Sequence, residues 1–322
     1  DRNVVKGRSN MNIFLQSLDV VLQDGFMYSI LAMGYYISYT ILDFPDLTVE
    51  GTVLSGGITF GLLVRAGINP WLAMLAAFAV GFIFGALTGI LHVKLKIRPL
   101  LCGILVSTGL ISVNLITTVV GMGGNFAGDG ALSTIDVGRG VPTLIRTFPA
   151  NLLPTDVGGF NLRKLLTFFV IALLFKLLLD AYLKTKNGLL LRAAGDNEKY
   201  VSMLAKNAGN SKILGLAIGN AYAAVSGALI VQSRGNVNQG MGVGMIVIGL
   251  ASLIIGLSVF GRIRFMKPTT MVIIGSVIYQ GCLGIALVLG VPSAYNKIIM
   301  AVLFTLALVF SSKVKKGGVK RA

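Results

Sequence analysis

Apolar runs recur along the chain, and short polar segments separate them. Eight runs have about the 20 residues that a helix needs to cross the hydrocarbon core of a bilayer. They lie near residues 24 to 41, 70 to 93, 100 to 120, 163 to 183, 211 to 232, 243 to 260, 268 to 289 and 295 to 312. A ninth run, residues 52 to 64, would cover only about 20 Å as a helix. The pattern predicts an all-α, polytopic membrane helix bundle of about nine transmembrane helices, within a range of eight to ten.

Composition agrees with a lipid environment. Of the 322 residues, 55% are hydrophobic and only 12% are charged, and the mean hydropathy is +0.83. About a quarter of the residues of a soluble domain are charged. The net charge of +16 does not indicate nucleic acid as a partner, because Lys and Arg cluster between the apolar runs. We therefore expect residues 1–322 to form a single transmembrane domain with the lipid bilayer as its surroundings.

The basic clusters predict the orientation of the chain, because Lys and Arg gather in cytoplasmic loops. Four clusters stand out: Lys94, Lys96 and Arg98; Lys184 to Lys212; Arg262, Arg264 and Lys267; and Lys313 to Arg321. Two crossings separate each cluster from the next, so all four fit on the cytoplasmic side. If residues 52–64 cross the membrane, nine crossings place the amino terminus outside, which we expect; if they are re-entrant, it lies inside. The carboxyl terminus is expected in the cytoplasm.

Residues 12–23 precede the first long run and have an amphipathic pattern. Phe14, Leu18 and Val21 or Leu22 fall on one face of a helix. This pattern predicts an amphipathic helix that lies on the membrane surface.

Residues 42–64 predict a broken helix. Asp43, Asp46 and Glu50 lie beside Pro45, directly before the short run. Non-helical backbone at membrane depth persists only where protein or a water-filled cavity solvates it, and carboxylates there tend to mark transport pathways. The alternative is an ordinary cytoplasmic turn with three solvated acids. We assign Asp43, Asp46, Thr48, Glu50, Ser55, Gly56 and Gly57 to the wall of a translocation path as candidates.

A second break begins at Gly235 and continues through Gly240, Gly242 and Gly244. A basic turn and a long run from Pro268 follow it, as a turn and a long run from Pro70 follow the first break. In the predicted topology residues 52–64 and 243–260 run in opposite directions, which indicates an inverted repeat.

Small residues recur at four-residue spacing on two of the runs. They are Gly81, Gly85 and Gly89 on one run and Gly215, Gly219 and Ala223 on another. This spacing places them on one face of a helix, where backbones can approach closely, and we expect them to serve packing.

Two long polar stretches are expected on opposite sides of the membrane. Residues 121–162 form a glycine-rich external loop, which is either a surface for a partner or simply a long connection. Residues 184–210 form the largest cytoplasmic stretch. There Asp196 is a suitable helix N-cap, Glu198 fits the first turn and Gly209 could end the helix.

Residues 196–209 would then form a short helix with an apolar ridge of Tyr200, Leu204 and Ala208. The ridge could dock in a groove of another protein. The alternative is a surface helix that lies against the membrane or its own bundle.

No pattern of residues indicates an enzyme. The chain has no Gly-x-x-x-x-Gly-Lys-Ser/Thr loop, no Gly-x-Ser-x-Gly elbow and no His-Glu-x-x-His helix. Cys102 and Cys282 are expected to be small core residues, and His92, the single histidine, to be a satisfied or interfacial side chain. Neither a cofactor nor a metal site is expected on this chain.

Three segments resemble the bacterial ABC importer permeases of the branched-chain amino acid and ribose type, most closely the tryptophan-type branch. Asp43 to Gly51, followed by Gly56-Gly57, resembles the family's first helix break; residues 188–197 resemble the segment leading into the helix that contacts the ATPase; and Gly242 to Gly261 resembles a late Gly-rich segment. The chain differs from the ribose type in lacking an additional amino-terminal span. It also has Arg262-Ile-Arg264 where a Gly-rich turn is usual.

The resemblance implies a permease subunit in a bacterial inner membrane that translocates a small solute, such as the amino acid tryptophan. It implies a homodimer of permeases, two cytoplasmic ATPase subunits that carry ATP and magnesium, and an external binding protein or lipoprotein. The residues that match the ATPase-coupling segment are Gly195, Asp196, Asn197, Glu198, Tyr200 and Leu204.

Two other classes of function fit parts of the pattern. One is a stand-alone secondary transporter that would bind coupling ions at Asp43, Asp46 or Glu50. The other is a membrane scaffold without transport activity, for which substitution of Glu50 or Gly57 would leave uptake unchanged.

Overall fold

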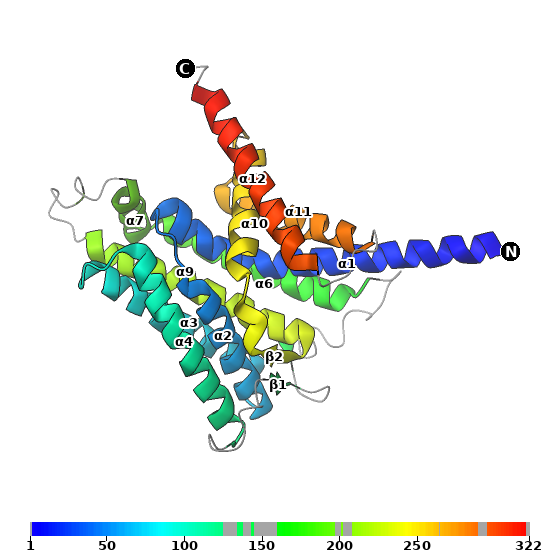
Figure 1. Ribbon diagram of the computed structural model, residues 1–322, viewed down its shortest axis with the longest axis horizontal. Helices are drawn as coiled ribbons and strands as arrows, with labels where there is room; N and C mark the ends of the chain where they lie inside the picture. Colours follow the sequence, from blue (N-terminus) through cyan, green and yellow to red (C-terminus); the bar gives the residue numbers. More distant parts are fainter. Residues whose placement is uncertain are drawn as a thin grey trace. The chain divides into compact units, whose positions relative to one another are not determined.

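Most of the chain is helical in the computed structural model, which describes residues 2–124, 134–137, 143–144, 160–196, 201, 208–263, 265–288 and 295–319 (Figure 1). The helices are α1 (Arg2–Tyr35), the π-helix η1 (Tyr36–Ile41), α2 (Thr48–Arg65), α3 (Pro70–Val93), α4 (Pro99–Gly121), α6 (Leu162–Lys184), α7 (Lys186–Asp196), α9 (Ala208–Arg234), the 3-10 helix η2 (Gln239–Gly242), α10 (Met245–Phe260), α11 (Pro268–Val288) and α12 (Asn296–Val319). The predicted helical class is confirmed.

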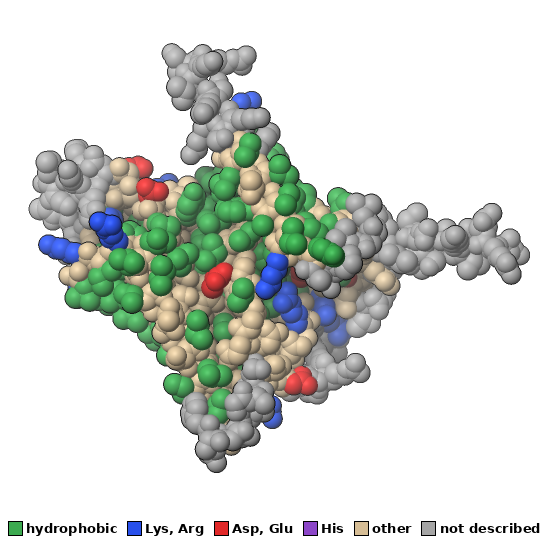
Figure 2. Space-filling view, in the orientation of Figure 1, with side chains coloured by type: hydrophobic (Ala, Val, Ile, Leu, Met, Phe, Trp, Pro, Cys, Tyr) green, Lys and Arg blue, Asp and Glu red, His purple; other side chains and the backbone are tan. Residues whose placement is uncertain are grey.

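Six helical segments of the described residues are long and apolar enough to cross a membrane. They are Pro70–Val93, Pro99–Gly121, Leu162–Lys184, Gly209–Arg234, Gln239–Phe260 and Pro268–Ala286, and a shorter apolar helical segment covers Lys297–Val309. The polytopic membrane architecture is thus confirmed, whereas the count of about nine crossings stays a prediction. Figure 2 shows hydrophobic side chains over much of the face that it draws. Leu75 and Ile83 of α3 are 63% and 61% exposed, as expected of side chains that lipid solvates.

Prolines mark the starts of several helices. Pro70 opens α3, Pro99 opens α4 and Pro268 opens α11. Proline suits the first helical position because the amide hydrogen that it lacks would have no partner within the helix there. At α3 the side chain of Asn69 also accepts a hydrogen bond from the backbone amide of Trp71, at 2.9 Å.

The chain divides into two compact units, and the larger comprises Met33–Leu144 and Phe175–Ile246. Within it α9 is the central helix, since 83% of its most apolar window is buried, and Figure 1 shows α2 and α3 beside it. Gly81, Gly85 and Gly89 of α3 lie directly against α9, where a β-carbon would meet the backbone or side chains of that helix. The predicted packing role of these glycines is confirmed.

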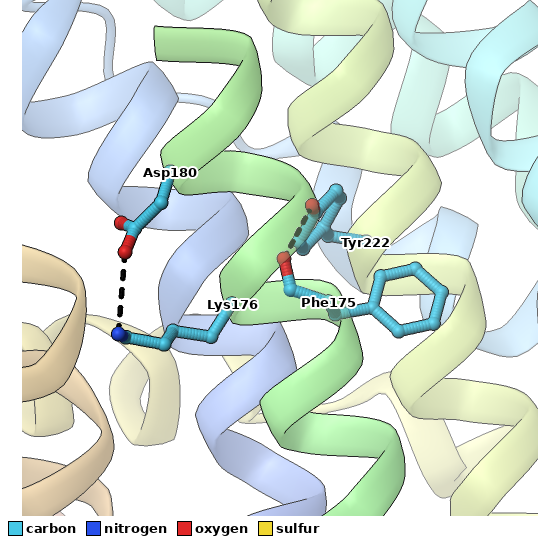
Figure 3. A network of polar contacts seen from close by, with 4 residues as sticks. All are labelled: Phe175, Lys176, Asp180 and Tyr222. Atoms are coloured by element: carbon cyan, nitrogen blue, oxygen red, sulfur yellow. Dashed lines mark hydrogen bonds and ion pairs between the residues drawn. The ribbon is translucent and has the colours of Figure 1, made fainter. Parts of the chain in front are cut away.

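The carboxyl-terminal half of α6 joins the same unit through polar contacts (Figure 3). Tyr222 of α9 donates a hydrogen bond to the carbonyl oxygen of Phe175 at 2.9 Å, and the two rings pack edge to face with centroids 5.1 Å apart. Within α6 itself, Lys176, the residue after Phe175, forms an ion pair with Asp180 at 3.2 Å. The pair lets two charged side chains sit on an otherwise apolar helix, because each neutralises the other.

Two short strands belong to this unit as well, and the sequence pattern did not predict them. β1 (Thr134–Asp136) pairs antiparallel with β2 (Asn236–Asn238), with Ile135 opposite Val237. Both of these side chains are buried, and they lie next to Gly61 near the end of α2. The part of the predicted external loop at 134–137 is therefore fixed to the start of the second break.

The smaller unit comprises Asp1–Ala32, Ile145–Leu174 and Val247–Ala322. Ser276 of α11 donates a hydrogen bond to the carbonyl oxygen of Gly25 in α1 at 2.8 Å, and the rings of Phe26 and Phe169 pack edge to face. Gly256 of α10 lies directly against the backbone of Met271 in α11. Small residues again mark the places where helices approach closely.

Helix α1 runs without interruption through residues 12–23, which were predicted as a separate amphipathic helix, and through much of the first long run. Leu18 is exposed, whereas Asp19 and Gln23 are buried. The Gln23 side chain donates to Asp19 at 2.7 Å, and the same carboxylate accepts from the backbone amide of Asn161 at 3.0 Å. Polar side chains can lie on the buried face here because they hydrogen-bond to one another.

Gly85 offers a test of the contact between α3 and α9. We expect Gly85→Leu to lower the melting temperature of the purified protein in detergent, because the new side chain would overlap the carbonyl oxygen of Leu216. Overpacking of this kind costs about 1–3 kcal/mol. Gly109→Leu on α4 is the matched control, since a β-carbon at Gly109 meets no atom within 4 Å. Equal melting temperatures of the two variants would contradict the assignment.

Candidate functional site

The first helix break separates η1 from α2 and spans residues 42–47. Pro45 prevents the helix from continuing, since proline has no amide hydrogen and its ring clashes with the preceding turn. Asp43 has a backbone φ of 52°, in the left-handed region that few non-glycine residues adopt. The next helix begins when the carboxylate of Asp46 accepts a hydrogen bond from the backbone amide of Thr48, at 2.9 Å.

A buried polar network holds this break to α9. The second oxygen of the Asp46 carboxylate accepts from the side-chain amide of Asn220 at 2.6 Å, and the amide oxygen of Asn220 accepts from the hydroxyl of Thr52 at 2.9 Å. Asp46 is only 2% exposed and Asn220 is fully buried. The buried hydrogen bond between Asp46 and Asn220 therefore ties the start of α2 to the central helix.

Further polar side chains connect α2 with its other neighbours. The hydroxyls of Thr48 and Thr88 lie 2.9 Å apart, which links α2 to α3. On the α4 side Ser55 donates to the amide oxygen of Asn114 at 2.7 Å, and Asn114 in turn donates to the carbonyl oxygen of Gly51 at 3.1 Å. The helices α3, α4 and α9 therefore each contribute a polar partner to the first half of α2.

The second break, residues 235–244, packs along α2. Val237 lies next to Gly61, Met241 next to Gly57, and Gly242 against the carbonyl oxygen of Glu50. These contacts follow α2 over 11 residues, or about 16 Å of helix. The segment from β2 through the short 3-10 helix η2 thus interrupts the α-helices and runs beside α2 within the larger unit.

Glu50 binds the end of the second break. Its carboxylate accepts a hydrogen bond from the backbone amide of Gly244 at 2.8 Å, one residue before α10 begins. Gly244 has a φ of 90°, a conformation that glycine adopts without strain. A carboxylate near the start of a helix is favourable, because the first amides have no partner within the helix. The first break and the end of the second break therefore both lie within a few residues of the start of α2.

The predicted path residues fall into two groups. Asp46, Thr48, Ser55, Gly56 and Gly57 are buried inside the larger unit, and Glu50 is partly exposed. Gly56 lies against the backbone of Ala224 in α9, so it serves helix packing in this structure. The structure does not bring Asp43 into this cluster, because its side chain is exposed on the far side of Pro45. Their part in a translocation path stays a prediction.

Sequence reasoning missed the partners of these residues: Asn220, Asn114, Thr52 and Thr88. Asn114 and Asn220 lie within long apolar runs, near 100 to 120 and 211 to 232, and both are almost fully buried. A polar amide within such a run is costly in lipid unless it faces the bundle interior. That signal was present in the sequence and could have identified both asparagines.

Of the predicted ATPase-coupling residues, Gly195 and Asp196 end α7, a helix that the sequence pattern did not predict. Gly195 lies directly against the carbonyl oxygen of Ile41, so α7 docks on the end of η1. Asn197, Glu198, Tyr200 and Leu204 lie outside the described residues. The prediction that Gly209 ends a helix is wrong, because Gly209 lies in the first turn of α9. Glycine weakens a helix without forcing it to stop.

Two further expectations concern the histidine and metals. The Nδ1 atom of His92 lies 2.9 Å from the carbonyl oxygen of Ile97, and its ring packs edge to face on Phe44. The predicted satisfied histidine is confirmed. Among the described residues no group of three or more His, Cys, Asp or Glu side chains could hold a metal ion.

Comparison with known proteins places this architecture among transport permeases. A family described as the permease component of branched-chain amino acid transport systems matches residues 17–308. A tyrosine transport system permease protein of Clostridioides difficile is 37% identical over 288 residues, which are 88% of this chain and 87% of that protein. A high-affinity branched-chain amino acid transport system permease protein of Pseudomonas aeruginosa is 27% identical, over 71% of this chain and 74% of that protein. No solved structure matches the chain.

Asp46 is the residue of the network whose loss should be most costly. In Asp46→Asn, an NH₂ group would replace one of the two carboxylate oxygens. That group would face a donor, either the backbone amide of Thr48 or the side-chain amide of Asn220. We expect a loss of about 1–3 kcal/mol in stability, since a buried donor is left without an acceptor. Thermal unfolding in detergent measures the loss. Asp43→Asn is the control, because this carboxylate is exposed and should leave the melting temperature unchanged.

Proposed function

Because the chain belongs to the permease family of branched-chain amino acid transport systems, we propose that it is the membrane-spanning subunit of an ATP-driven importer for an aromatic amino acid. It is a multi-pass membrane protein and a transport component, not an enzyme. The observation that carries the proposed substrate is the 37% identity with a tyrosine transport system permease over most of both chains. Tyrosine and tryptophan are the proposed cargo.

The proposed assembly contains two copies of this permease, two ATPase subunits and an external binding protein. The absence of a phosphate-binding loop from the sequence supports ATP and magnesium binding on a partner subunit. The basic clusters support a bacterial inner-membrane protein whose ATPase side, with residues 184–212 and the carboxyl terminus, is cytoplasmic. The binding protein docks on the opposite side, at the predicted external stretch of residues 121–162.

The contacts of α7 support a route by which ATPase motion reaches the path. A push on the segment that follows Asp196 moves α7, which rests on the end of η1 through Gly195 and the carbonyl of Ile41. The break that follows η1 leads directly to α2, and α2 holds the second break through Glu50 and Gly244. Both non-helical segments therefore move when α7 moves. The buried network around Asp46 keeps the start of α2 and the central helix α9 together during this motion.

An ion-coupled secondary transporter is the less well supported alternative. Such a transporter needs carboxylate oxygens that are available to a cation. The Asp46 carboxylate is occupied by the donors of Thr48 and Asn220, and one oxygen of Glu50 by the amide of Gly244. Two of the three candidate carboxylates thus already serve the helix breaks.

Reconstitution tests the proposed function. We expect proteoliposomes that contain this chain, its ATPase and its binding protein to accumulate labelled tyrosine or tryptophan when ATP is supplied to the ATPase side. Leucine measures selectivity, and a non-hydrolysable ATP analogue is the control for coupling. Uptake that follows a sodium or proton gradient without ATP would refute the importer, and uptake of leucine alone would refute the aromatic cargo.

The coupling segment can be tested separately. Changing both Tyr200 and Leu204 to Glu should abolish co-purification of the ATPase, because an apolar ridge that fits a groove cannot accept two charges. Asp136→Arg on β1 is the control, since it places a new charge at the predicted external side. If the ATPase still co-purifies with the double variant, residues 196–209 are not the coupling surface.

A further inference from the structure

The second break, residues 235–244, has one exposed side. Its exposed residues are Asn236, Asn238, Gly240 and Val243, the last at 59%. The residues of its other side are buried and contact α2: Val237, Met241 and Gly242. The contacts with α2 extend from Gly61 to Glu50, which is about 16 Å of helix. An exposed strip therefore follows α2 over this length.

The end of this strip lies at membrane depth. Thr48 of α2 contacts Thr88 of α3, and Thr88 lies five residues before Val93, where α3 ends. Since α2 and α3 run in opposite directions and Glu50 follows Thr48 by two residues, Glu50 lies about 10 Å from the end of a helix about 36 Å long. Gly242 packs on the carbonyl oxygen of Glu50, so the end of the second break lies at the same depth.

Lipid is a poor solvent for this part of the strip. The carboxylate of Glu50 is partly exposed, and so is Gly244, whose backbone lies outside any helix. Non-helical backbone is tolerated at membrane depth only against protein or water, and a carboxylate at the centre of a bilayer costs about 2.5 kcal/mol or more. The end of the strip therefore requires a polar environment, unlike Ile83 on the apolar surface of α3.

Glu50 has one carboxylate oxygen for a further partner. Its Oε1 accepts the hydrogen bond from the amide of Gly244 at 2.8 Å, which fixes the side chain at the end of the second break. Within the part of the chain that the structure describes, no residue donates to Oε2 or forms an ion pair with it. The same part contains no group of three His, Cys, Asp or Glu side chains that could hold a metal ion. A single ammonium group suits this oxygen better than a metal ion does.

We propose that the exposed strip lines an aqueous translocation path, and that Glu50 binds the α-ammonium group of the amino acid that passes along it. The inference rests on the proposed function and names the residue that selects for an amino group. In the predicted topology Asn236 and Asn238 lie toward the external side, where the cargo enters, and Glu50 lies deeper. The contact between carboxylate and ammonium is charge-assisted, and Val243 offers apolar surface beside it. A path has to release its cargo, and one contact that water can replace allows release.

Labelling of an introduced cysteine tests whether the strip faces water. Val243→Cys is made in a chain with Cys102→Ala and Cys282→Ala, and is treated in nanodiscs, with the ATPase bound, with a cationic or an anionic methanethiosulfonate reagent. We expect both reagents to react, and the cationic one severalfold faster, because the Glu50 carboxylate attracts it. A lack of reaction with both would show that lipid or protein covers the strip, and would overturn the inference.

Two control positions calibrate the labelling. Ile83→Cys on α3 should react with neither reagent, because Ile83 is exposed on an apolar membrane helix. Thr134→Cys on β1 should react with both, because Thr134 is exposed in the ribbon that packs near Gly61, about 16 Å along α2 from Glu50.

Glu50→Gln separates the charge of Glu50 from its structural role. The variant loses the negative charge but keeps an acceptor oxygen for the amide of Gly244, so the melting temperature should not change. We expect the preference of Val243→Cys for the cationic reagent to fall to the value measured at Thr134→Cys. A preference that persists in Glu50→Gln would contradict the role of this carboxylate.

Protection from labelling identifies the ligand group. L-Tryptophan and tryptamine both carry an ammonium group, and each should slow the labelling of Val243→Cys severalfold in the absence of the binding protein. Indole-3-propionate lacks the ammonium group and should not protect, and none of the three compounds should protect when Glu50→Gln is present. Equal protection by all three compounds, or by none, would overturn the assignment of Glu50 to the ammonium group.

Uptake measures the consequence for transport. In proteoliposomes with the ATPase and the binding protein, Glu50→Gln should lower the maximal uptake rate of tryptophan severalfold. The half-saturating concentration of the loaded binding protein should stay the same, because that protein docks on the external side. An unchanged maximal rate would refute the proposed role of Glu50. Failure of the proposed function is distinguishable, because the unchanged protein would then take up no aromatic amino acid, whereas the labelling experiments require no transport.

Discussion

Non-helical backbone inside a membrane bundle has to find its hydrogen-bond partners within the protein, and the structure around α2 follows from this constraint. The chain interrupts its helices twice in the larger unit, at residues 42–47 and at 235–244. Asp46 binds the first amide of α2, and Glu50 binds the amide that precedes α10. Two carboxylates four residues apart thus satisfy the backbone at the ends of two breaks, and both belong to the segment that leads into or starts α2.

A carboxylate in such a place needs partners of its own. Asn220 supplies one from the middle of α9, and its amide also binds Thr52, so the contact fixes both the position and the rotation of α2 against the central helix. The side chain of Asn220 can reach Asp46 because the helices approach one another closely. Gly81 and Gly85 of α3 and Gly56 of α2 bring their backbones against α9, at distances that larger residues would not allow. Polar pairing and small-residue packing therefore depend on each other.

The same arrangement places a buried polar network next to an exposed segment. The network of Asp46, Thr52 and Asn220 is buried and bonded at several points. Asp43, only three residues earlier, is exposed and lines a pocket, and α7 contacts the end of η1 at Gly195. A permease that works with a separate ATPase needs both properties, a rigid element beside the path and a contact surface that transmits motion.

Much of this protein could be predicted from its sequence. Hydropathy and proline positions gave the long helices, because the length of an apolar run and the loss of an amide hydrogen are properties of neighbouring residues. Pro45 and the glycines from 235 to 244 located both breaks for the same reason, and the matching segments indicated the permease family. The sequence pattern did not predict α7 or the β1–β2 pair, since a helix of 11 residues and strands of three depend on what they pack against.

The partners across the fold were decided by tertiary structure alone. Asp46 and Asn220 are 174 residues apart, and Glu50 and Gly244 are 194 residues apart. Nothing in the local pattern of either segment specifies the other, because the pairing depends on which faces of α2, α9 and the second break meet. The pocket of Asp43, His92 and Lys212 likewise exists only where the ends of separate helices converge. The sequence by itself therefore determined the helical membrane class, the interruptions and the family, because these follow from neighbouring residues. The tertiary structure decided which side chains stabilise the interruptions, because those pairs come from distant segments.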